Sequence, residues 1–387
     1  MNYSKNKIYA VLLALWIYIK PYTLILFLGI DLTTIAYIQY LLSIILFVIA
    51  FYINNLKINL NLCLFFFGYL FLVFFNALLV DYPNYVLIDG LAYFIIFLTP
   101  MFIISSSLFD FDNFIFFWYK LGIINTFLLG IYLFLMMLGL FSYGDVADLI
   151  LPNIIIFGYI TSLKKSYFPF FYCLTNVVAA VFWAGRMDAF SALITLFLFF
   201  IVFSNSKKIK IFVIGIVTSV SALIFINLNS IIIILLNFLT NYSINSRNFS
   251  LLENQISNQD LFSHFHLANR DIVYNTAIDY LNARYWLPGG FGIIRNLTNG
   301  FFYHPHNLFL ELSLYFGVFG TLIFFIIIIL KYSNLKKLSK EYQYKFLVVL
   351  GLFYFILSQS GNSFFTFFAS ILLLSILFFS RKKAFIN

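Results

Sequence analysis

Long apolar stretches, separated by short polar breaks, follow one another along most of this 387-residue chain. A helix needs about 20 consecutive apolar residues to cross the hydrocarbon core of a bilayer. The pattern therefore predicts an all-α, polytopic membrane protein with about twelve transmembrane helices. Their expected positions are 8–28, 34–53, 62–80, 86–104, 121–141, 149–163, 168–184, 189–204, 211–238, 307–330, 346–360 and 364–379.

The composition excludes a soluble protein. Apolar residues make up 63% of the chain and charged residues only 10%, whereas a soluble domain has about 25% charged residues. The two cysteines, Cys63 and Cys173, both lie in apolar runs. This placement excludes a disulfide framework and a cysteine-based zinc cluster.

The basic residues indicate how the chain crosses the membrane. A net charge of +9 in a soluble protein would suggest a nucleic-acid partner, but membrane proteins accumulate Lys and Arg in their cytoplasmic turns. If both termini are cytoplasmic, 17 of the 23 basic residues fall on the inner side: Lys5, Lys7, Lys57, Lys120, Lys164, Lys165, Lys207, Lys208, Lys210, Lys331, Lys336, Lys337, Lys340, Lys345, Arg381, Lys382 and Lys383. Apart from Lys20 in the first span, the others are outer arginines. We therefore expect no nucleic-acid partner.

One long polar stretch, residues 240–305, separates the ninth span from the tenth. Its arginines and its acidic residues are equal in number, so it is not a polybasic surface. A loop this long is usually functional or disordered. Apolar residues recur at helical spacing from Arg270 to Tyr285, which predicts a helix on the outer membrane surface, ended by the segment Pro288-Gly289-Gly290-Phe291-Gly292. The expected organisation is thus spans one to nine in 1–239, a large outer loop in 240–305, and spans ten to twelve in 306–387.

All four histidines, His264, His266, His304 and His306, fall in or directly after that loop. Polar residues must lie outside the hydrocarbon, and this alone could explain why the histidines cluster. For His264, His266 and His304 this explanation is as good as a functional role. His306 differs because Asn307 and Glu311 follow it.

Asn307 and Glu311 are four residues apart, so they project from one face at the outer end of the tenth span. A carboxylate at that depth is a functional candidate. Gly317 and Gly320 lie further along the same span, and ordinary close packing of a neighbouring helix explains these two glycines best.

These residues resemble a known family. The string His306-Asn307, nine residues, then Gly317-x-x-Gly320, preceded by Gly290-x-Gly292 and by Arg270 in a large external loop, is similar to the O-antigen polymerase and O-antigen ligase superfamily of bacterial inner membranes. Arg186, between spans seven and eight, matches a second family mark. The family's usual serine before that arginine is Gly185 here.

The resemblance implies an all-helical glycosyltransferase fold of the C type, working without nucleotide sugars, metal ions or other cofactors. Such enzymes transfer a glycan from undecaprenyl diphosphate to another sugar at the periplasmic face. The implied partners are the lipid-linked donor and acceptor and the bilayer, with a chain-length regulator as a further candidate.

Physical chemistry assigns roles to the candidate residues. Arginine offers a planar, permanently charged fork for phosphate, so Arg186 and Arg270 are candidates to hold the leaving diphosphate. A neutral histidine near pH 7 can accept the proton of the attacking hydroxyl, which makes His306 the candidate base. Glu311 or Asn307 would orient its ring.

Other assignments remain open. His306 could bind substrate while Glu311 takes the proton. His304, Asn307 and Arg247 are further candidates for substrate binding. Arg247, Arg284 and Arg295 are equally well explained as loop salt bridges, since each has an acidic residue nearby in sequence.

Three other functions compete with the polymerase. A ligase would transfer the finished glycan to lipid A core, and the AT-rich coding composition favours the polymerase. A transporter or flippase usually has ionisable or helix-breaking residues in mid-span, and here Lys20-Pro21 is the main irregularity, able to kink a helix or to bind a lipid head group. A metal site at His304 and His306, or at His264 and His266, is disfavoured because residues two apart share a face only on a strand and no further ligands follow at a recognised spacing.

Overall fold

The computed structural model describes residues 2–164, 166–208, 210–211, 215, 270–359 and 368–385, and these residues form helices and turns without a strand. Contacts divide the chain into two compact units. The first comprises Met1–Trp118 and Ala268–Asn387, and the second comprises Tyr119–Leu267. Each unit is described by itself.

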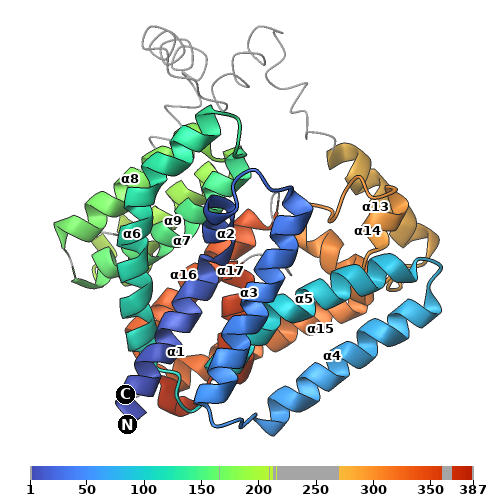
Figure 1. Ribbon diagram of the computed structural model, residues 1–387, viewed down its shortest axis with the longest axis horizontal. Helices are drawn as coiled ribbons and strands as arrows, with labels where there is room; N and C mark the ends of the chain where they lie inside the picture. Colours follow the sequence, from blue (N-terminus) through green and yellow to red (C-terminus); the bar gives the residue numbers. More distant parts are fainter. Residues whose placement is uncertain are drawn as a thin grey trace, which may run out of the picture. The chain divides into compact units, whose positions relative to one another are not determined.

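The first unit is organised around helix α5. Its helices are α1 (Asn2–Ile17), α2 (Ile19–Leu26), α3 (Leu32–Ile53), α4 (Leu60–Leu79), α5 (Pro83–Ser105), α13 (Arg270–Ala283), α14 (Ile293–Leu297), α15 (Leu308–Leu338), α16 (Glu341–Leu357), α17 (Phe368–Phe379) and the 3₁₀ turn η1 (Lys382–Phe385) (Figure 1). Helix α5 packs against α1, α3, α4, α14 and α17. Residues from both ends of the sequence therefore share one core.

A bend interrupts the first expected span. Helices α1 and α2 meet at an angle of 65° around Tyr18. Pro21 has no N–H to donate to the carbonyl of Ile17, and its ring disfavours a continuous helix at that point. The kink that Lys20-Pro21 allows in the sequence is thus present.

The second unit contains most of α6 (Phe111–Met137), which begins in the first unit, followed by α7 (Tyr143–Lys164), α8 (Tyr167–Trp183) and α9 (Arg186–Phe203). Helix α7 packs against α8 and α9. Buried polar side chains connect three of these helices: Asn153 Nδ2 donates to Asn176 Oδ1 at 3.0 Å, and Asn176 Nδ2 donates to Thr126 Oγ1 at 3.0 Å. Such interhelical bonds favour one packing register where hydrocarbon surrounds the helices.

The described helices make this a multi-pass membrane protein. Six of them are long and apolar enough to cross a bilayer, or seven if the bent pair α1–α2 counts as one span. Three shorter apolar helices, Tyr167–Trp183, Asp188–Phe203 and Phe368–Phe379, accompany them. Every expected span within the described residues coincides with a helix, whereas most of the expected span 211–238 lies outside those residues.

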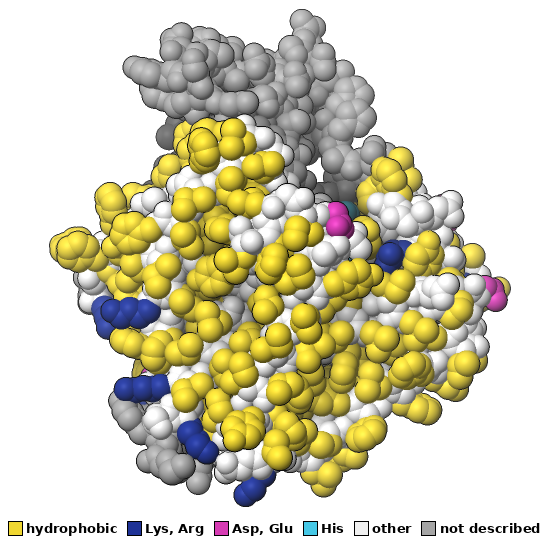
Figure 2. Space-filling model, viewed as in Figure 1, with side chains coloured by type: hydrophobic (Ala, Val, Ile, Leu, Met, Phe, Trp, Pro, Cys, Tyr) yellow, Lys and Arg dark blue, Asp and Glu magenta, His cyan; other side chains and the backbone are white. Residues whose placement is uncertain are grey.

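Apolar side chains also cover the outside of the helices. On α4 the exposed fractions of Leu64, Phe67, Phe71, Phe74 and Leu78 lie between 52% and 84%. These residues are spaced three and four apart, so they form one stripe along the helix. Figure 2 shows hydrophobic side chains over most of the visible face. An exposed apolar stripe of this kind is suited to contact with the hydrocarbon of a bilayer.

Two lysines lie at one end of the first unit. At this end Lys5 Nζ donates to the carbonyl of Ile53 at 3.1 Å, and Lys340 pairs with Asp112 at 3.4 Å. Helix α4 leads from this end to the other, and its 20 residues span about 30 Å. At the opposite end Tyr82 Oη donates to the carbonyl of Gly289 at 2.7 Å. The lysines and the segment 284–306 therefore lie at opposite ends of the unit.

The helix expected over 270–285 is present as α13, but it ends at Ala283, before the proline and glycines. Tyr285 and Trp286 adopt left-handed backbone conformations, with φ of 54° and 61°, and the Trp286 N–H closes the end by donating to the Leu281 carbonyl at 2.8 Å. Its apolar face, Val273, Ala277 and Leu281, is buried, and the helix packs against α14 and α15. The apolar periodicity thus serves packing within the protein.

Candidate functional site

His304 and His306 lie side by side just before α15. Their ring centroids are 4.2 Å apart, and the edge of Phe302 meets the His306 ring at 6.3 Å. His306 has φ of 55°, a left-handed conformation that turns its side chain back toward His304 across Pro305. Tyr274 Oη donates to the His306 carbonyl at 3.3 Å. The expectation that these two histidines would not share a face was therefore wrong.

Asn307 starts the helix that follows. Its Oδ1 accepts the N–H of Leu310 at 3.1 Å, an N-cap bond, and its carbonyl accepts the N–H of Glu311 at 2.9 Å. The expected helix start at residue 307 is confirmed to within one residue. Capping fixes the direction in which α15 leaves the histidine pair.

Glu311 is buried one turn further along, with an exposed fraction of 2%. It lies within Coulombic range of the hydroxyls of Tyr93 on α5, Tyr315 on α15 and Tyr354 on α16. Phenolic hydroxyls are donors that can solvate a carboxylate. Tyrosines from three helices of the first unit therefore lie in the neighbourhood of the buried acid.

Helix α15 is broken at Gly317, and an extended segment of the loop fills the break. Gly317 has φ of 71° and ψ of 170°, so Val318 N–H no longer reaches the carbonyl of Leu314. Val318 N–H donates instead to the Trp286 carbonyl at 3.2 Å. The Leu314 carbonyl accepts the N–H groups of Gly289 at 2.7 Å and Gly290 at 3.1 Å.

The expected role of Gly317, packing against a neighbouring helix, was thus wrong. A Cβ at this position would lie 3.0 Å from both Pro288 Cδ and the Trp286 carbonyl oxygen, because a loop segment rather than a helix approaches. At Gly320 the nearest atoms belong to Phe316 of the same helix.

The backbone conformation and the close neighbours of the Gly290-x-Gly292 motif both require glycine. Both glycines have positive φ, 90° and 72°. A Cβ on Gly290 would overlap the side chain of Asn76 on α4, and one on Gly292 would lie 2.8 Å from the backbone of Tyr85 on α5. Between them, Phe291 N–H donates to Asn76 Oδ1 at 3.2 Å. The motif lets the loop lie directly on α4 and α5.

A buried ion pair secures the next part of the loop. Arg295 Nη1 lies 2.6 Å from Asp89 Oδ1 on α5, and the two side chains are 15% and 9% exposed. The guanidinium also lies over the rings of Tyr85 and Tyr303, at 5.0 and 4.7 Å. The sequence suggests an acid close to Arg295 in the chain as its partner. The structure shows instead an acid 206 residues away.

Sequence reasoning overlooked Asp89. A single carboxylate in the otherwise apolar span 86–104 was a signal, since intramembrane acids usually have a specific partner. Among the described residues, Arg284 does not form the loop salt bridge that the sequence suggests for it. Its Nη1 donates to Tyr280 Oη at 2.6 Å, and the described residues offer it no carboxylate within ion-pair distance.

The arginines that sequence reasoning assigned to the diphosphate fall in different units. Arg186 is the first residue of α9 in the second unit, and Arg270 is the first described residue of α13 in the first unit. Their side chains lie outside the described part of the structure, as do the residues Arg247, His264 and His266. Within the first unit, the structure brings His304 and His306 together and places Asn307 at the N-cap and Glu311 in the first turn of α15, which follows.

The described residues contain no group of three or more His, Cys, Asp or Glu side chains that could hold a metal ion, including at the histidine pair. No family model matches the chain, and comparison with curated proteins and with solved structures gives no match. The fold and this site define a polytopic helical membrane protein with a histidine and carboxylate cluster at one end.

The Asp89–Arg295 pair should be important for stability. Replacing Arg295 by Gln leaves a buried carboxylate without its cation, and we expect a loss of about 3–5 kcal/mol in the free energy of unfolding. The measurement is chemical unfolding of the purified protein in detergent. Arg284→Gln, at an exposed arginine, serves as the matched control and should change stability by about 0.5 kcal/mol or less.

The double variant Asp89→Asn/Arg295→Gln tests the cause. Removing both charges should restore part of the lost stability, since no unpaired charge remains. If the two single effects simply add, the ion pair is not the source of the destabilisation.

The break in α15 should require glycine at position 317. Gly317→Ala places a side chain in a left-handed conformation against Pro288 and Trp286, and we expect it to cost about 1–3 kcal/mol. The control is Gly68→Ala on α4, where a Cβ meets open space and alanine should be neutral or stabilising. Equal unfolding midpoints for the two variants would contradict the proposed fit of loop and helix.

Proposed function

We propose that this protein is an O-antigen polymerase, which joins undecaprenyl-diphosphate-linked oligosaccharide repeats at the periplasmic face of the bacterial inner membrane. The observation that carries the proposal is the close pair His304–His306 directly before the helix turn that contains the buried Glu311. This cluster lies at the end of the first unit opposite to the lysines. It combines a titratable base with a nearby acid at a membrane boundary.

The proposal includes a finer architecture than the described helices define. It has about twelve spans in a glycosyltransferase fold of the C type, with residues 240–305 as the large periplasmic loop. By the positive-inside rule the lysine end of the first unit faces the cytoplasm. The histidine pair then faces the periplasm, where lipid-linked repeats are exposed.

The chemistry assigned to the cluster is a displacement at the anomeric carbon of the donor sugar. The acceptor hydroxyl oxygen forms the new glycosidic bond, the bond from that carbon to the diphosphate oxygen breaks, and its electron pair leaves with undecaprenyl diphosphate. His306 takes the hydroxyl proton, which is typically worth about 100- to 10,000-fold in rate. Glu311 could stabilise the imidazolium that results, or take the proton itself with His306 binding substrate.

Arg186 and Arg270 are assigned to the leaving diphosphate. Supporting this, Gly185 is the N-cap of α9 and provides no side-chain cap, so the first N–H groups of that helix have no acceptor from the cap residue. Helix N-termini in general favour anions, and Asp188 in the first turn of α9 is the acidic residue present there. His304, Asn307 and Arg247 are assigned to substrate binding, and a chain-length regulator is a further partner.

A ligase that transfers the glycan to lipid A core would use the same chemistry and stays the alternative. A transporter has one observation in its favour, the broken helix α15, since carriers bind ions at such breaks. Here, however, the loop already pairs the Leu314 carbonyl and the Val318 N–H. The break therefore serves to seat the loop, which favours an enzyme.

Single substitutions test the assigned residues. Arg186→Ala, Arg270→Ala and His306→Ala should each lower chain extension by about 100-fold or more, with normal amounts of protein in the membrane. His264→Ala should be mild and is the matched control. The measurement is lipopolysaccharide chain length in a deletion strain carrying each variant. Full activity would remove that residue from the mechanism, and a reversed order of the two histidines would overturn the choice of base.

Deleting the gene separates the polymerase from its alternatives. On a lipopolysaccharide gel, a core bearing one repeat is expected and identifies a polymerase. A bare core, with glycan retained on the undecaprenyl carrier, would identify a ligase instead. Unchanged glycan would contradict both assignments.

A further inference from the structure

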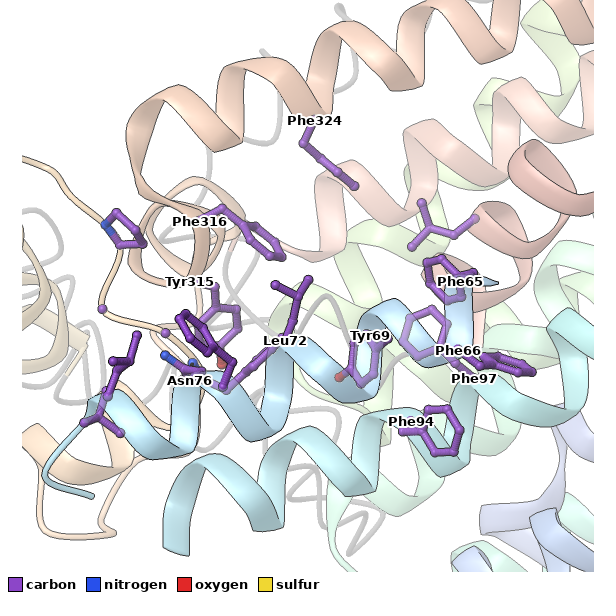
Figure 3. A pocket seen from close by; sticks show the side chains of 18 of the residues that line it. Phe65, Phe66, Tyr69, Leu72, Asn76, Phe94, Phe97, Tyr315, Phe316 and Phe324 are labelled. Atoms are coloured by element: carbon purple, nitrogen blue, oxygen red, sulfur yellow. Dashed lines mark hydrogen bonds between the residues drawn. The ribbon is translucent and has the colours of Figure 1, made fainter. Parts of the chain in front are cut away.

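An apolar cavity of about 630 Å³ lies within the first unit, beside the site already described. Its walls come from α4, α5, α15 and α17 and from the loop segment 288–291. Figure 3 shows side chains of α4 and α15 facing one space, among them Tyr69, Phe316 and Phe324. More than half of the lining residues are aromatic. The volume falls in the range of ligand-binding cavities.

The cavity runs along much of the membrane thickness. On α4 alone its lining extends from Phe65 to Leu79, about 21 Å along the helix axis, against about 30 Å for the hydrocarbon core. Several lining residues of α4 are also exposed to the surroundings, Leu72 at 57% and Phe75 at 49%. An apolar space of this kind excludes water. A hydrocarbon chain is therefore the ligand that best matches its lining.

Charge appears at one end only. Among the lining residues that the structure describes, only Asp81 and Arg284 carry a formal charge. Asp81 follows the end of α4, and Arg284 follows the end of α13, so both lie where the helices leave the hydrocarbon. The hydroxyl of Tyr82 lies within Coulombic range of both. Burial raises the pKa of this hydroxyl above its usual range, so Tyr82 stays protonated and keeps donating to Gly289.

Aromatic residues mark the same level. Tyr280, Tyr285 and Trp286 surround Arg284 in sequence, and Tyr280 Oη accepts from its guanidinium. Tyr and Trp are enriched where the hydrocarbon meets the head groups. The charged end of the cavity therefore has the position and composition of a head-group site.

We propose that this cavity binds one acyl chain of a zwitterionic glycerophospholipid, with the phosphate at Arg284 and the head-group ammonium at Asp81. One cation and one anion at the mouth match a head group that carries one of each. A diphosphate carrier would bring more negative charge than one arginine beside an aspartate balances. The proposal goes beyond the proposed function and stands or fails independently of it.

The experiment uses the full-length protein purified in detergent and exchanged into an equimolar mixture of phosphatidylethanolamine, phosphatidylglycerol and a polyprenyl phosphate. Native mass spectrometry then identifies the retained lipid without any turnover. Phosphatidylethanolamine should be retained in preference. Preferential retention of the polyprenyl phosphate would instead assign the cavity to the lipid-linked substrate and overturn the proposal.

Variants at the mouth test the two charges. Arg284→Ala should lower retention of both phospholipids about tenfold, since both carry the phosphate. Asp81→Asn should abolish the preference for phosphatidylethanolamine and spare phosphatidylglycerol. Both side chains are exposed, so these changes should leave the unfolding midpoint in place. If Asp81→Asn leaves the preference unchanged, the ammonium assignment is wrong.

A variant inside the cavity tests the acyl chain. Leu72→Trp fills part of the space and should reduce phospholipid retention about tenfold or more. Phe67→Trp is the matched control on the same helix, because Phe67 is 74% exposed and does not line the cavity. Equal retention by the two variants, or no retained lipid in the unaltered protein, would refute the binding site.

Discussion

The most consequential interaction in the first unit is the exchange of backbone hydrogen bonds at the break in α15. In a bilayer, unpaired N–H and C=O groups are costly, so a helix can break only where other groups replace its lost bonds. Here the Leu314 carbonyl accepts from Gly289 and Gly290, and the Trp286 carbonyl accepts from Val318. The loop thus satisfies the backbone groups that the break in α15 leaves unpaired, and the break in turn satisfies groups of the loop. Either one alone would leave unpaired backbone groups.

This exchange fixes one end of the segment that leads to the histidines. The other end is fixed by the cap of Asn307 on α15 and by the bond from Leu308 N–H to the Ser358 carbonyl at 3.1 Å. Between these points the Asp89–Arg295 pair holds α14 against α5. Three separate attachments therefore support the His304–His306 pair. Rigid support of this kind is what a catalytic or binding cluster requires if its groups are to keep their geometry.

Much of the helical framework is predictable from sequence, because about 20 apolar residues between polar breaks identify a membrane helix. The expected spans 34–53 and 62–80 agree with α3 and α4 to within two residues. Helix α6 starts ten residues before the expected position, at Phe111, since Asp112, Asn113 and Lys120 look like a polar break. In the structure Asp112 instead accepts hydrogen bonds from Tyr342 and Lys340.

The site was less predictable because its interactions join distant parts of the chain. Local sequence places His306, Asn307 and Glu311 at a helix start, which the structure confirms. It cannot show that Arg295 meets Asp89 or that Gly317 has positive φ, since both depend on how the loop lies on other helices. The closeness of His304 and His306 likewise depends on a left-handed residue that the sequence does not reveal.

The loop segment 288–291 and the residues Tyr315 and Phe316 form one wall of the apolar cavity. On one side, Tyr315 lies near the carboxylate of Glu311, and on the other side it lines the cavity. The backbone of Gly289 and Gly290, which lines the cavity, is also the backbone that donates to the Leu314 carbonyl at the break in α15. Packed interiors transmit small displacements because they have little free space. The cavity wall and the bonds that support the break in α15 thus belong to one packed structure.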